Sequence, residues 1–324
     1  MPEITFREAI RQAMREEMAR DPRVFLIGED IGAYGGTYAV TRGFLEEFGE
    51  RRVVDAPIAE AGIVGLAVGA AMAGLRPIAE MMSVNFTLLA LDQIVNHAAK
   101  VHSMFGGKFT APLVIRVNTG FGQLAATHSQ NFDAWFAHVP GLKVVSPATP
   151  CDAKGLLKAA IHDPDPVVYI EHGALYNRRG EVPEDEYQVP IGKADIKREG
   201  SHVTIVTYAR MLHESLAAAD ELAKEGIQCE VVDLRTLRPL DTHTVLRSFQ
   251  KTNRAVVAEE AWRTGGLGAE IAARVQEEGF DYLDAPIARV AAPEVPLPYA
   301  RELERAAIPN RDNVVRAVKQ LLGA

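Results

Sequence analysis

Cysteine and long apolar runs are both scarce in this sequence. Cys151 and Cys229 are the only cysteines among 324 residues, too few for a disulfide framework or a cysteine-ligated zinc site. Even the apolar stretch of residues 56–75 contains Glu60 and five glycines or prolines, which argues against a membrane span. The amino terminus is charged and amphipathic and has no apolar secretory segment. We therefore expect a cytoplasmic protein with no membrane partner.

Positive charge is in the minority. The sequence has 35 Lys and Arg against 43 Asp and Glu, a formal net charge of −8. This balance disfavours a nucleic-acid partner, because phosphate backbones are bound by clustered Lys and Arg. Hydrophobic residues make up 48% and charged residues 24% of the chain, which is typical of a globular protein. The length fits two domains of ordinary size, so an enzyme or enzyme subunit is indicated.

Helical and strand periods alternate along the chain, the pattern of α/β units with mostly parallel strands. A first helix carries Phe6, Ile10 and Met14 on one face, and Thr149 is placed to cap another helix ahead of Pro150. Strands are predicted at 24–27, 53–54, 77–81, 113–117, 144–145, 167–170, 203–206, 230–232 and 255–258, and further helices at 62–73, 84–104, 212–223, 242–249, 267–275 and 312–322.

The alternation stops between residues 175 and 200. This stretch is rich in proline, glycine and charge, so we interpret it as a linker or crossing strap that contributes nothing to a core. The sequence therefore predicts one domain at residues 1–185, a linker at 186–200 and a second domain at 201–324.

Residues 57–62 open an apolar helix that is rich in glycine. Each glycine costs a helix about 1 kcal/mol relative to alanine, so a smooth face for close approach of another backbone is indicated. Glu60 stands at the entrance, with no Lys or Arg in the next dozen residues. Apolar surroundings would raise its pKa, whereas a helix amino terminus favours the ionised form. Taken alone, Glu60 also fits an ordinary acid at the start of a helix.

Polar residues also follow two predicted strands. Glu29 and Asp30 come directly after the strand at 24–27, and Met82, Ser83 and Phe86 come after the strand at 77–81. Open α/β sheets bind ligands at the carboxyl ends of their strands, so these residues could line one crevice. A plain surface loop at Glu29 and a core position for Phe86 remain alternatives.

His128 is the best candidate for proton transfer among the histidines. It follows a glycine-rich turn after a strand, and imidazole titrates near neutrality. A surface histidine is the alternative. His97 and His102 are five residues apart, not the four that align two ligands on one helix face, which argues against a metal site there.

Two glycine motifs are weak matches. Residues 120–125 fit the dinucleotide pattern GxGxxA, but no helix pattern follows and no acid stands about 20 residues on. Residues 106–108 lack the upstream glycine and the hydroxyl residue of a phosphate-binding loop.

Near Ala160 and Ile161, unpaired helix carbonyls precede Asp163 and Asp165, a set of oxygens that suits a hard cation. A solvated acidic turn is the alternative.

The ordered motifs resemble those of one family along nearly the whole chain. The β subunits of thiamine diphosphate-dependent 2-oxo acid dehydrogenases are similar at GED (28–30), YGG (34–36), IAE (58–60), LRP (75–77), NF (85–86), LDQ (91–93), HSQ (128–130), PGLKVV (140–145) and DLRT (233–236). The resemblance implies two three-layer α/β domains with mostly parallel sheets: a pyrimidine-binding domain, then a transketolase C-terminal-like domain.

The resemblance assigns roles to the residues singled out above. It implies that Glu60 bonds a ring nitrogen of the cofactor's aminopyrimidine and so promotes deprotonation of the thiazolium carbon. A carboxyl that stays near neutral at working pH suits that task. The resemblance also implies that Phe86 packs on the pyrimidine, that Glu29, Ile58, Ala59 and Met82 approach it, and that Ser83, Phe86 and His128 face the substrate.

The resemblance further implies a structural potassium site. Relatives more often have Asn where Asp165 stands, which keeps an oxygen but leaves the ion open. The matching residues are Leu113, Ala160, Ile161, Asp163 and Asp165.

The sequence has neither a GDG motif nor an NN pair, although thiamine enzymes hold the diphosphate and magnesium with a GDG motif and a later Asn. The resemblance implies that a separate α subunit provides the diphosphate-binding half of the site and binds Mg, in a heterotetramer of two α and two β chains. It also implies docking of the lipoyl acyltransferase of the complex.

We therefore expect a subunit that, with α, decarboxylates a 2-oxo acid and reductively acylates a lipoyl group. Branched-chain 2-oxo acids are slightly favoured over pyruvate. Half of a split transketolase or deoxyxylulose-type synthase is one alternative, although we see no basic cluster for phosphosugars. A non-catalytic nucleotide-binding or scaffold subunit, with Glu60 as a capping acid, is another.

Overall fold

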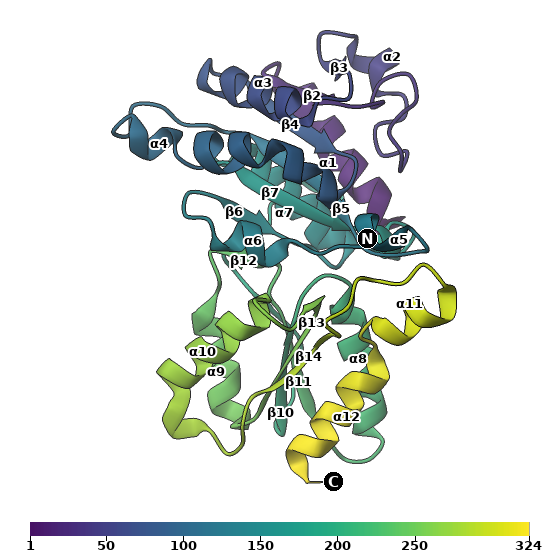
Figure 1. Ribbon diagram of the computed structural model, residues 1–324, viewed down its shortest axis with the longest axis vertical. Coiled ribbons are helices and arrows are strands. Elements are labelled where there is room, and N and C mark those ends of the chain that lie inside the picture. The colour runs from purple at the N-terminus through teal and green to yellow at the C-terminus, as the bar shows by residue number, and fades with distance from the viewer. Residues whose placement is uncertain (324) are drawn as a thin grey trace. The chain divides into compact units, whose positions relative to one another are not determined.

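The computed structural model describes residues 1–323, and the chain divides into two compact units. Unit 1 comprises residues 1–120 and 135–191, and unit 2 comprises residues 121–134 and 192–324. Both are α/β units with mostly parallel sheets, so the predicted fold class is confirmed (Figure 1). The placement of residues 121–134 in unit 2 was not apparent from the sequence.

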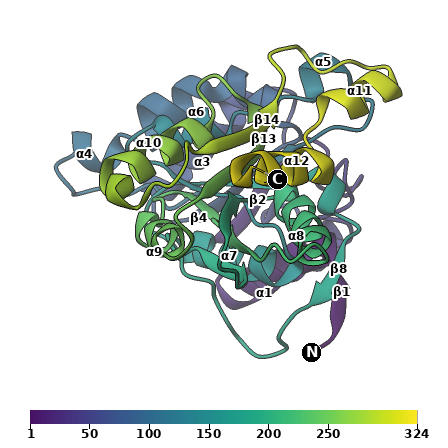
Figure 2. The ribbon, with the colours of Figure 1, turned by 90° about the horizontal axis from the view of Figure 1, so that it is seen from below.

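The sheet of unit 1 has parallel strands in the order β6-β7-β5-β4-β2-β3. Its central strands are continuous apolar runs, because helices cover both faces of a parallel sheet. A short antiparallel pair, β1 with β8, ties the amino terminus to the end of the unit (Figure 2). The strands are β1 (Glu3–Thr5), β2 (Val24–Gly28), β3 (Val53–Asp55), β4 (Arg76–Met81), β5 (Val114–Thr119), β6 (Lys143–Val145), β7 (Val167–His172) and β8 (Arg179–Glu181).

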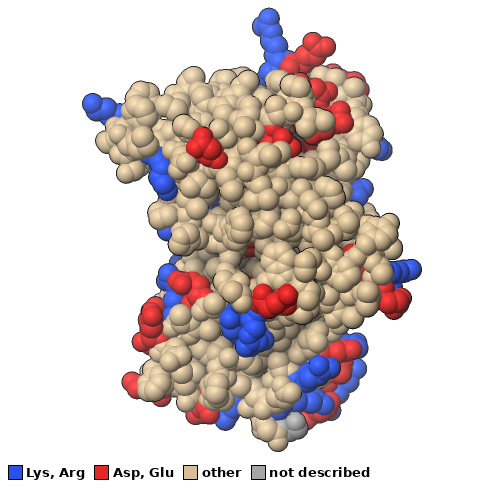
Figure 3. Space-filling model, viewed as in Figure 1, with Lys and Arg blue, Asp and Glu red and all other residues tan. Residues whose placement is uncertain are grey.

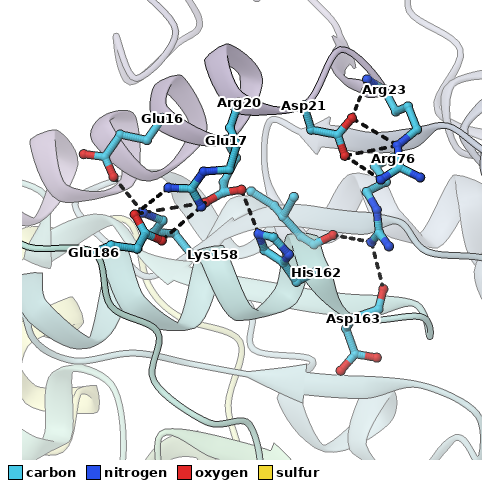
Figure 4. A network of polar contacts seen from close by, with 11 residues as sticks. Glu16, Glu17, Arg20, Asp21, Arg23, Arg76, Lys158, His162, Asp163 and Glu186 are labelled. Atoms are coloured by element: carbon cyan, nitrogen blue, oxygen red, sulfur yellow. Dashed lines mark hydrogen bonds and ion pairs between the residues drawn. The ribbon is translucent and has the colours of Figure 1, made fainter.

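Two helices, α1 (Phe6–Arg20) and α7 (Pro150–His162), pack together on one side of this sheet, and α3 (Glu60–Met72) lies on the other side (Figures 1 and 2). The predicted cap is confirmed, because Thr149 accepts a hydrogen bond from the Asp152 amide at 3.1 Å. Lys158 of α7 is fully buried and pairs with Glu16 of α1 at 2.8 Å (Figure 4). The other helices of unit 1 are α2 (Phe44–Phe48), η1 (Val84–Ala90), η2 (Asp92–Ala98), α4 (Val101–Met104) and η3 (Gly173–Leu175), and α6 (Asp133–His138) begins in unit 2 and ends in unit 1.

Unit 2 has a sheet in the order β14-β13-β10-β11-β9, in which only β9 is antiparallel among the described strands. Helices α8 and α12 pack together on one side of this sheet, and α9 and α10 pack together on the other. The elements are β9 (Asp195–Arg198), β10 (Val203–Thr207), β11 (Cys229–Asp233), β12 (Thr236–Arg238), β13 (Ala255–Trp262), β14 (Ala288–Ala292), α5 (Ala125–His128), α8 (Arg210–Ala223), α9 (Thr242–Thr252), α10 (Leu267–Gly279), η4 (Phe280–Tyr282), α11 (Arg301–Ala307) and α12 (Arg311–Leu322).

The single helix predicted at residues 84–104 is wrong in detail. The segment is a 3₁₀ helix (η1), a π-helix (η2) and one α-helical turn (α4). Spacings of three residues also fit a 3₁₀ helix and spacings of four also fit a π-helix, so apolar residues every three or four positions do not tell these short segments from one α-helix.

The prediction that residues 175–200 contribute nothing to a core is also wrong. Leu175, Tyr176, Val182 and Val189 are buried in the core of unit 1. The Val189 amide donates to the carbonyl of Gly155 in α7 at 3.1 Å, and a Cβ on Gly155 would lie 2.5 Å from the Val189 side chain. The strap therefore packs on α7 because a glycine leaves room for it, a relation that no local period reveals.

Within residues 1–323, no helix is both long enough and apolar enough to cross a bilayer.

Gly141 is required both by its backbone angle and by a close neighbour. It has a φ of 97°, and a Cβ there would lie 1.9 Å from the carbonyl oxygen of Ala99. Gly49 has a φ of 77° but nothing within 4 Å of an added Cβ. Because Gly49 combines this φ with a ψ of 167°, a region essentially restricted to glycine, we predict that Gly49→Ala costs about 1–3 kcal/mol of unfolding free energy through backbone strain alone. Gly141→Ala should cost clearly more, because overpacking against a fixed backbone adds to that term. Denaturant unfolding of both variants checks this, and equal losses would contradict it.

Candidate functional site

Three neighbouring strands of unit 1 end at one edge of the sheet and deliver the predicted site residues there. Glu29 follows β2 directly, Met82 and Ser83 follow β4, and Glu60 begins α3 after the short segment that leaves β3. Since β3, β2 and β4 are adjacent and parallel, their carboxyl ends form one edge, the usual ligand position in open α/β sheets.

Glu60 is a buried acid without a partner. Its relative exposure is 8%, and within residues 1–323 no side chain donates a hydrogen bond to its carboxylate and no cation pairs with it. It lies in the first turn of α3, where the helix dipole favours a negative charge. The hydrogen-bonding capacity of this carboxylate is therefore not used by side chains of the described chain.

The pKa of Glu29 is affected by its neighbours at this edge. Burial raises its pKa, and repulsion by the charges of Asp30 and Glu60 adds to that effect. The electrostatic coupling places Glu29 and Glu60 in one acidic cluster at the sheet edge. That these two residues share a ligand site stays a prediction.

The loop after β2 is a compact turn rather than a free flap. The Gly32 amide donates to the Asp55 carboxylate at 2.7 Å, and the Thr41 hydroxyl donates to the carbonyl of Ile31 at 2.7 Å. A Cβ on Gly32 would lie 2.4 Å from the Asp55 carboxylate, so glycine is needed for this contact. Tyr34 at the tip is 66% exposed.

The residues after β4 turn at once into η1. The Ser83 hydroxyl donates to the Asn85 side chain at 2.7 Å, and the Phe86 amide donates to the carbonyl of Ser83 at 3.0 Å. These bonds fix the start of η1, and Phe86 is half-buried.

The segment that leads to Glu60 is exposed instead. Ile58 is 75% exposed and Ala59 is exposed, so the described part of the chain leaves this apolar surface uncovered.

Sequence reasoning missed a buried charge network beneath this edge. Arg116 of β5 pairs with Glu80 of β4 and with Glu171 of β7, and the Tyr176 hydroxyl donates to Glu171 at 2.7 Å. Burial raises the pKa of Glu171, against the opposing effect of Arg116. A Cβ on Gly36 would lie 3.3 Å from the Glu80 carboxylate, so the loop after β2 passes close to the network. The available signal was a charged residue in the interior of each of three apolar strands.

His128 lies at the end of α5 in unit 2 and is exposed, as are the residues of the loop before it. Glu60 and the acidic cluster belong to unit 1. The contact of His128 with substrate therefore stays a prediction.

The residues predicted to hold a cation come together, but the chain's own cations occupy the carboxylates. Lys143 contacts both oxygens of the Asp163 carboxylate at 2.7 Å and one of Asp165 at 3.2 Å. These carboxylates hold the pKa of Lys143 above its ordinary value, although burial lowers it.

The carbonyls of the same cluster are also bonded. Arg76 donates to the carbonyl of Ile161 at 2.7 Å, and its guanidinium also lies near the carbonyl of Asp163 (Figure 4). The carbonyls of Ala160 and Leu113 accept the amides of Asp163 and Val167. Within the described residues no group of three or more His, Cys, Asp or Glu side chains could hold a metal ion. A potassium ion here would compete with Arg76 and Lys143 for these oxygens, and the potassium site stays a prediction.

Comparison with known families divides the chain into two matched regions. Residues 2–178 match the family described as "Transketolase, pyrimidine binding domain", and residues 192–314 match "Transketolase, C-terminal domain". The first match covers the acidic cluster and the loop after β2.

Individual relatives are similar over the whole chain. A Rickettsia felis protein described as "Pyruvate dehydrogenase E1 component subunit beta" is 52% identical over 98% of both chains. A mitochondrial protein from Oryza sativa subsp. japonica with the corresponding description is 51% identical over 98% of this chain and 86% of its own. Among solved structures, a split gene transketolase, described as an inactive beta4 tetramer, has a TM-score of 0.81 and 26% identity over 99% of this chain and 98% of its own.

The raised pKa of Glu29 has a consequence for stability. A carboxyl whose pKa is higher in the folded state destabilises the fold once pH exceeds that pKa, and the penalty disappears below the unfolded value near about 4.3. We predict that Glu29→Gln raises the Tm at pH 7.5 by an amount on the order of a degree, and that the gain shrinks as pH falls toward 4. Exposed Glu46→Gln is the control and should not change the Tm. A gain at Glu29 that is independent of pH would contradict the electrostatic cause.

Proposed function

The chain belongs to the β subunits of thiamine diphosphate-dependent 2-oxo acid dehydrogenases, and on this premise we propose that it acts, together with an α subunit, in the decarboxylation of pyruvate. The relatives at about half identity are described as pyruvate dehydrogenase subunits. The expectation that slightly favoured branched-chain 2-oxo acids finds no support among them.

The observation that carries this proposal is the unpartnered carboxylate of Glu60. A nitrogen heterocycle at the sheet edge would give it the hydrogen-bond partner that the chain lacks, and an apolar ring face suits the half-buried Phe86. In this proposal, Glu60 holds a proton at a ring nitrogen of the aminopyrimidine, and Glu29, Ile58, Ala59 and Met82 line its surroundings. Ser83 and His128 face the substrate. The cofactor, when bound, supplies the carbon nucleophile and electron sink that decarboxylation needs.

The same edge is unsuited to the cofactor's diphosphate. Glu29, Asp30 and Glu60 are acids, and a phosphate group requires cations or a metal ion near it. We infer that the α subunit binds the diphosphate and Mg, so that neither chain holds the cofactor alone.

The surface around the site supports a partner chain. Leu66 on α3 is 54% exposed and Leu89 on η1 is 64% exposed, and a Cβ on Gly69 would meet nothing within 4 Å. The face of unit 1 in Figure 3 carries few charged side chains. Apolar surface of this kind marks an interface, and we propose that it is covered in a heterotetramer of two α and two β chains. Docking of a lipoyl acyltransferase, a potassium ion and a cytoplasmic location stay predictions.

A split transketolase is the second candidate, because the similar solved structure bears that description. Identity favours the first candidate, at 52% against 26%. That relative is described as an inactive tetramer of β chains, which supports the inference that this chain, too, needs an α partner for activity.

Removal of the proton at Glu60 tests the mechanism. We predict that Glu60→Gln in the α–β assembly lowers kcat for pyruvate at least about 100-fold, the usual contribution of a positioned proton donor. Asp152→Asn is a matched control, because Asp152 is a buried acid in the first turn of α7 with no role in the site. Its kcat should be unchanged, and equal effects of the two substitutions would refute the role of Glu60.

Substrate choice is tested by competition. We predict that kcat/KM for pyruvate exceeds that for 3-methyl-2-oxobutanoate by about tenfold or more, since extra methyl groups change pocket binding by roughly this factor. A preference for the branched substrate would overturn the assignment to pyruvate and leave the acidic cluster's role intact.

A further inference from the structure

The loop that leads to His128 has a backbone that needs outside support. Gly122 has a φ of 140°, and the non-glycine residues Gln123 and Ala125 have φ values of 58° and 66°. Side-chain-bearing residues rarely adopt these angles. None of the four residues of α5 is buried, so the loop gains little from burial of its own side chains. Contacts from elsewhere in unit 2 must therefore set its position.

Glu304 of α11 supplies the first such contact. Its side-chain oxygen accepts hydrogen bonds from the amides of Gln123 at 2.7 Å and Gly122 at 3.1 Å. Glu304 is 5% exposed, whereas Gly122 and Gln123 are exposed. A buried carboxylate bound to two successive amides makes charge-assisted bonds, which are stronger than neutral ones. It therefore anchors the loop to α11.

Arg210 supplies a second contact, to the neighbouring residue. Its guanidinium lies 5.1 Å from the ring centroid of Phe121, a cation–π distance. The same guanidinium pairs with Glu214 at 2.8 Å and with Glu260, and it donates to the carbonyl of Pro309. Arg210 is thus fixed from several sides. Phe121, Gly122 and Gln123 are held in place just before α5 begins.

We propose that Glu304 is a positioning residue for His128, acting through the amides of Gly122 and Gln123. The inference rests on the proposed role of His128 toward substrate. Gln123 is separated from α5 by a single residue, so a shift of the anchored amides is passed directly to the helical turn that ends at His128. A displacement of about 1 Å at a reacting group can cost 100-fold in rate.

The test uses the α–β assembly and Glu304→Ala. We expect kcat for pyruvate to fall about 10- to 100-fold and amide hydrogen exchange over residues 122–128 to become faster. The Kd for thiamine diphosphate should stay within about twofold of the wild-type value, because a loop shift in unit 2 leaves Glu60 and Glu29 in place. Glu302→Ala is the matched control: Glu302 is exposed on the same helix and lies 3.8 Å from Arg305. It should change none of the three measurements.

A double-mutant cycle separates positioning from general support of the fold. In the His128→Ala background, Glu304→Ala should cause no further loss of kcat, because its effect is transmitted through the imidazole. The same loss in both backgrounds would overturn the inference. If kcat is low in His128→Ala but unchanged in Glu304→Ala, the positioning role of Glu304 is wrong and the role of His128 stands. If kcat is unchanged in His128→Ala, the proposed role of His128 is refuted as well.

Should Glu304→Ala fail to assemble, Glu304→Gln carries the test. Its neutral oxygen can still accept from the two amides but binds them more weakly. We expect faster exchange over residues 122–128 and a decrease in kcat of about threefold, absent in the His128→Ala background. Unchanged exchange and kcat would refute the anchor.

Discussion

A buried carboxylate without a partner is the constraint on which the site depends. Glu60 is held at the start of α3 by the short segment after β3, within an acidic cluster and away from any cation of the described chain. Desolvating such a group costs free energy that a well-folded chain ordinarily offsets with a hydrogen bond. In the proposed function, the cofactor's aminopyrimidine provides this hydrogen bond.

The scaffold beneath the cluster is correspondingly rigid. Arg116, Glu80 and Glu171 connect the central strands β4, β5 and β7 through side chains that are almost fully buried. Removal of one member would leave a buried charge unpaired, the costly case for such networks. The network thus fixes β4, whose end carries Met82 and Ser83, against β5 and β7, while the exposed loop before His128 depends on contacts from Glu304 and Arg210.

The sequence predicted the parts of this molecule that local patterns encode. The strands that deliver Glu29 and Ser83, the cap at Thr149 and the acid at the head of a glycine-rich helix all follow from periods and spacing. The packing of Val189 on Gly155, the meeting of Arg116 with its two glutamates and the joining of residues 121–134 to unit 2 depend on residues far apart in the chain. The preference for pyruvate over branched-chain substrates is proposed from the descriptions of similar proteins, and no pattern in this sequence alone indicated it.

Proton exchange at the thiazolium carbon of bound thiamine diphosphate tests the central role of Glu60 most directly. The rate can be followed by rapid quench and NMR in the assembled α–β enzyme with either Glu60 or Glu60→Gln, at cofactor concentrations that saturate both. We expect exchange to be slower by at least about 100-fold in the variant, because the proton held by Glu60 is lost. Equal exchange rates in the two enzymes would contradict the account.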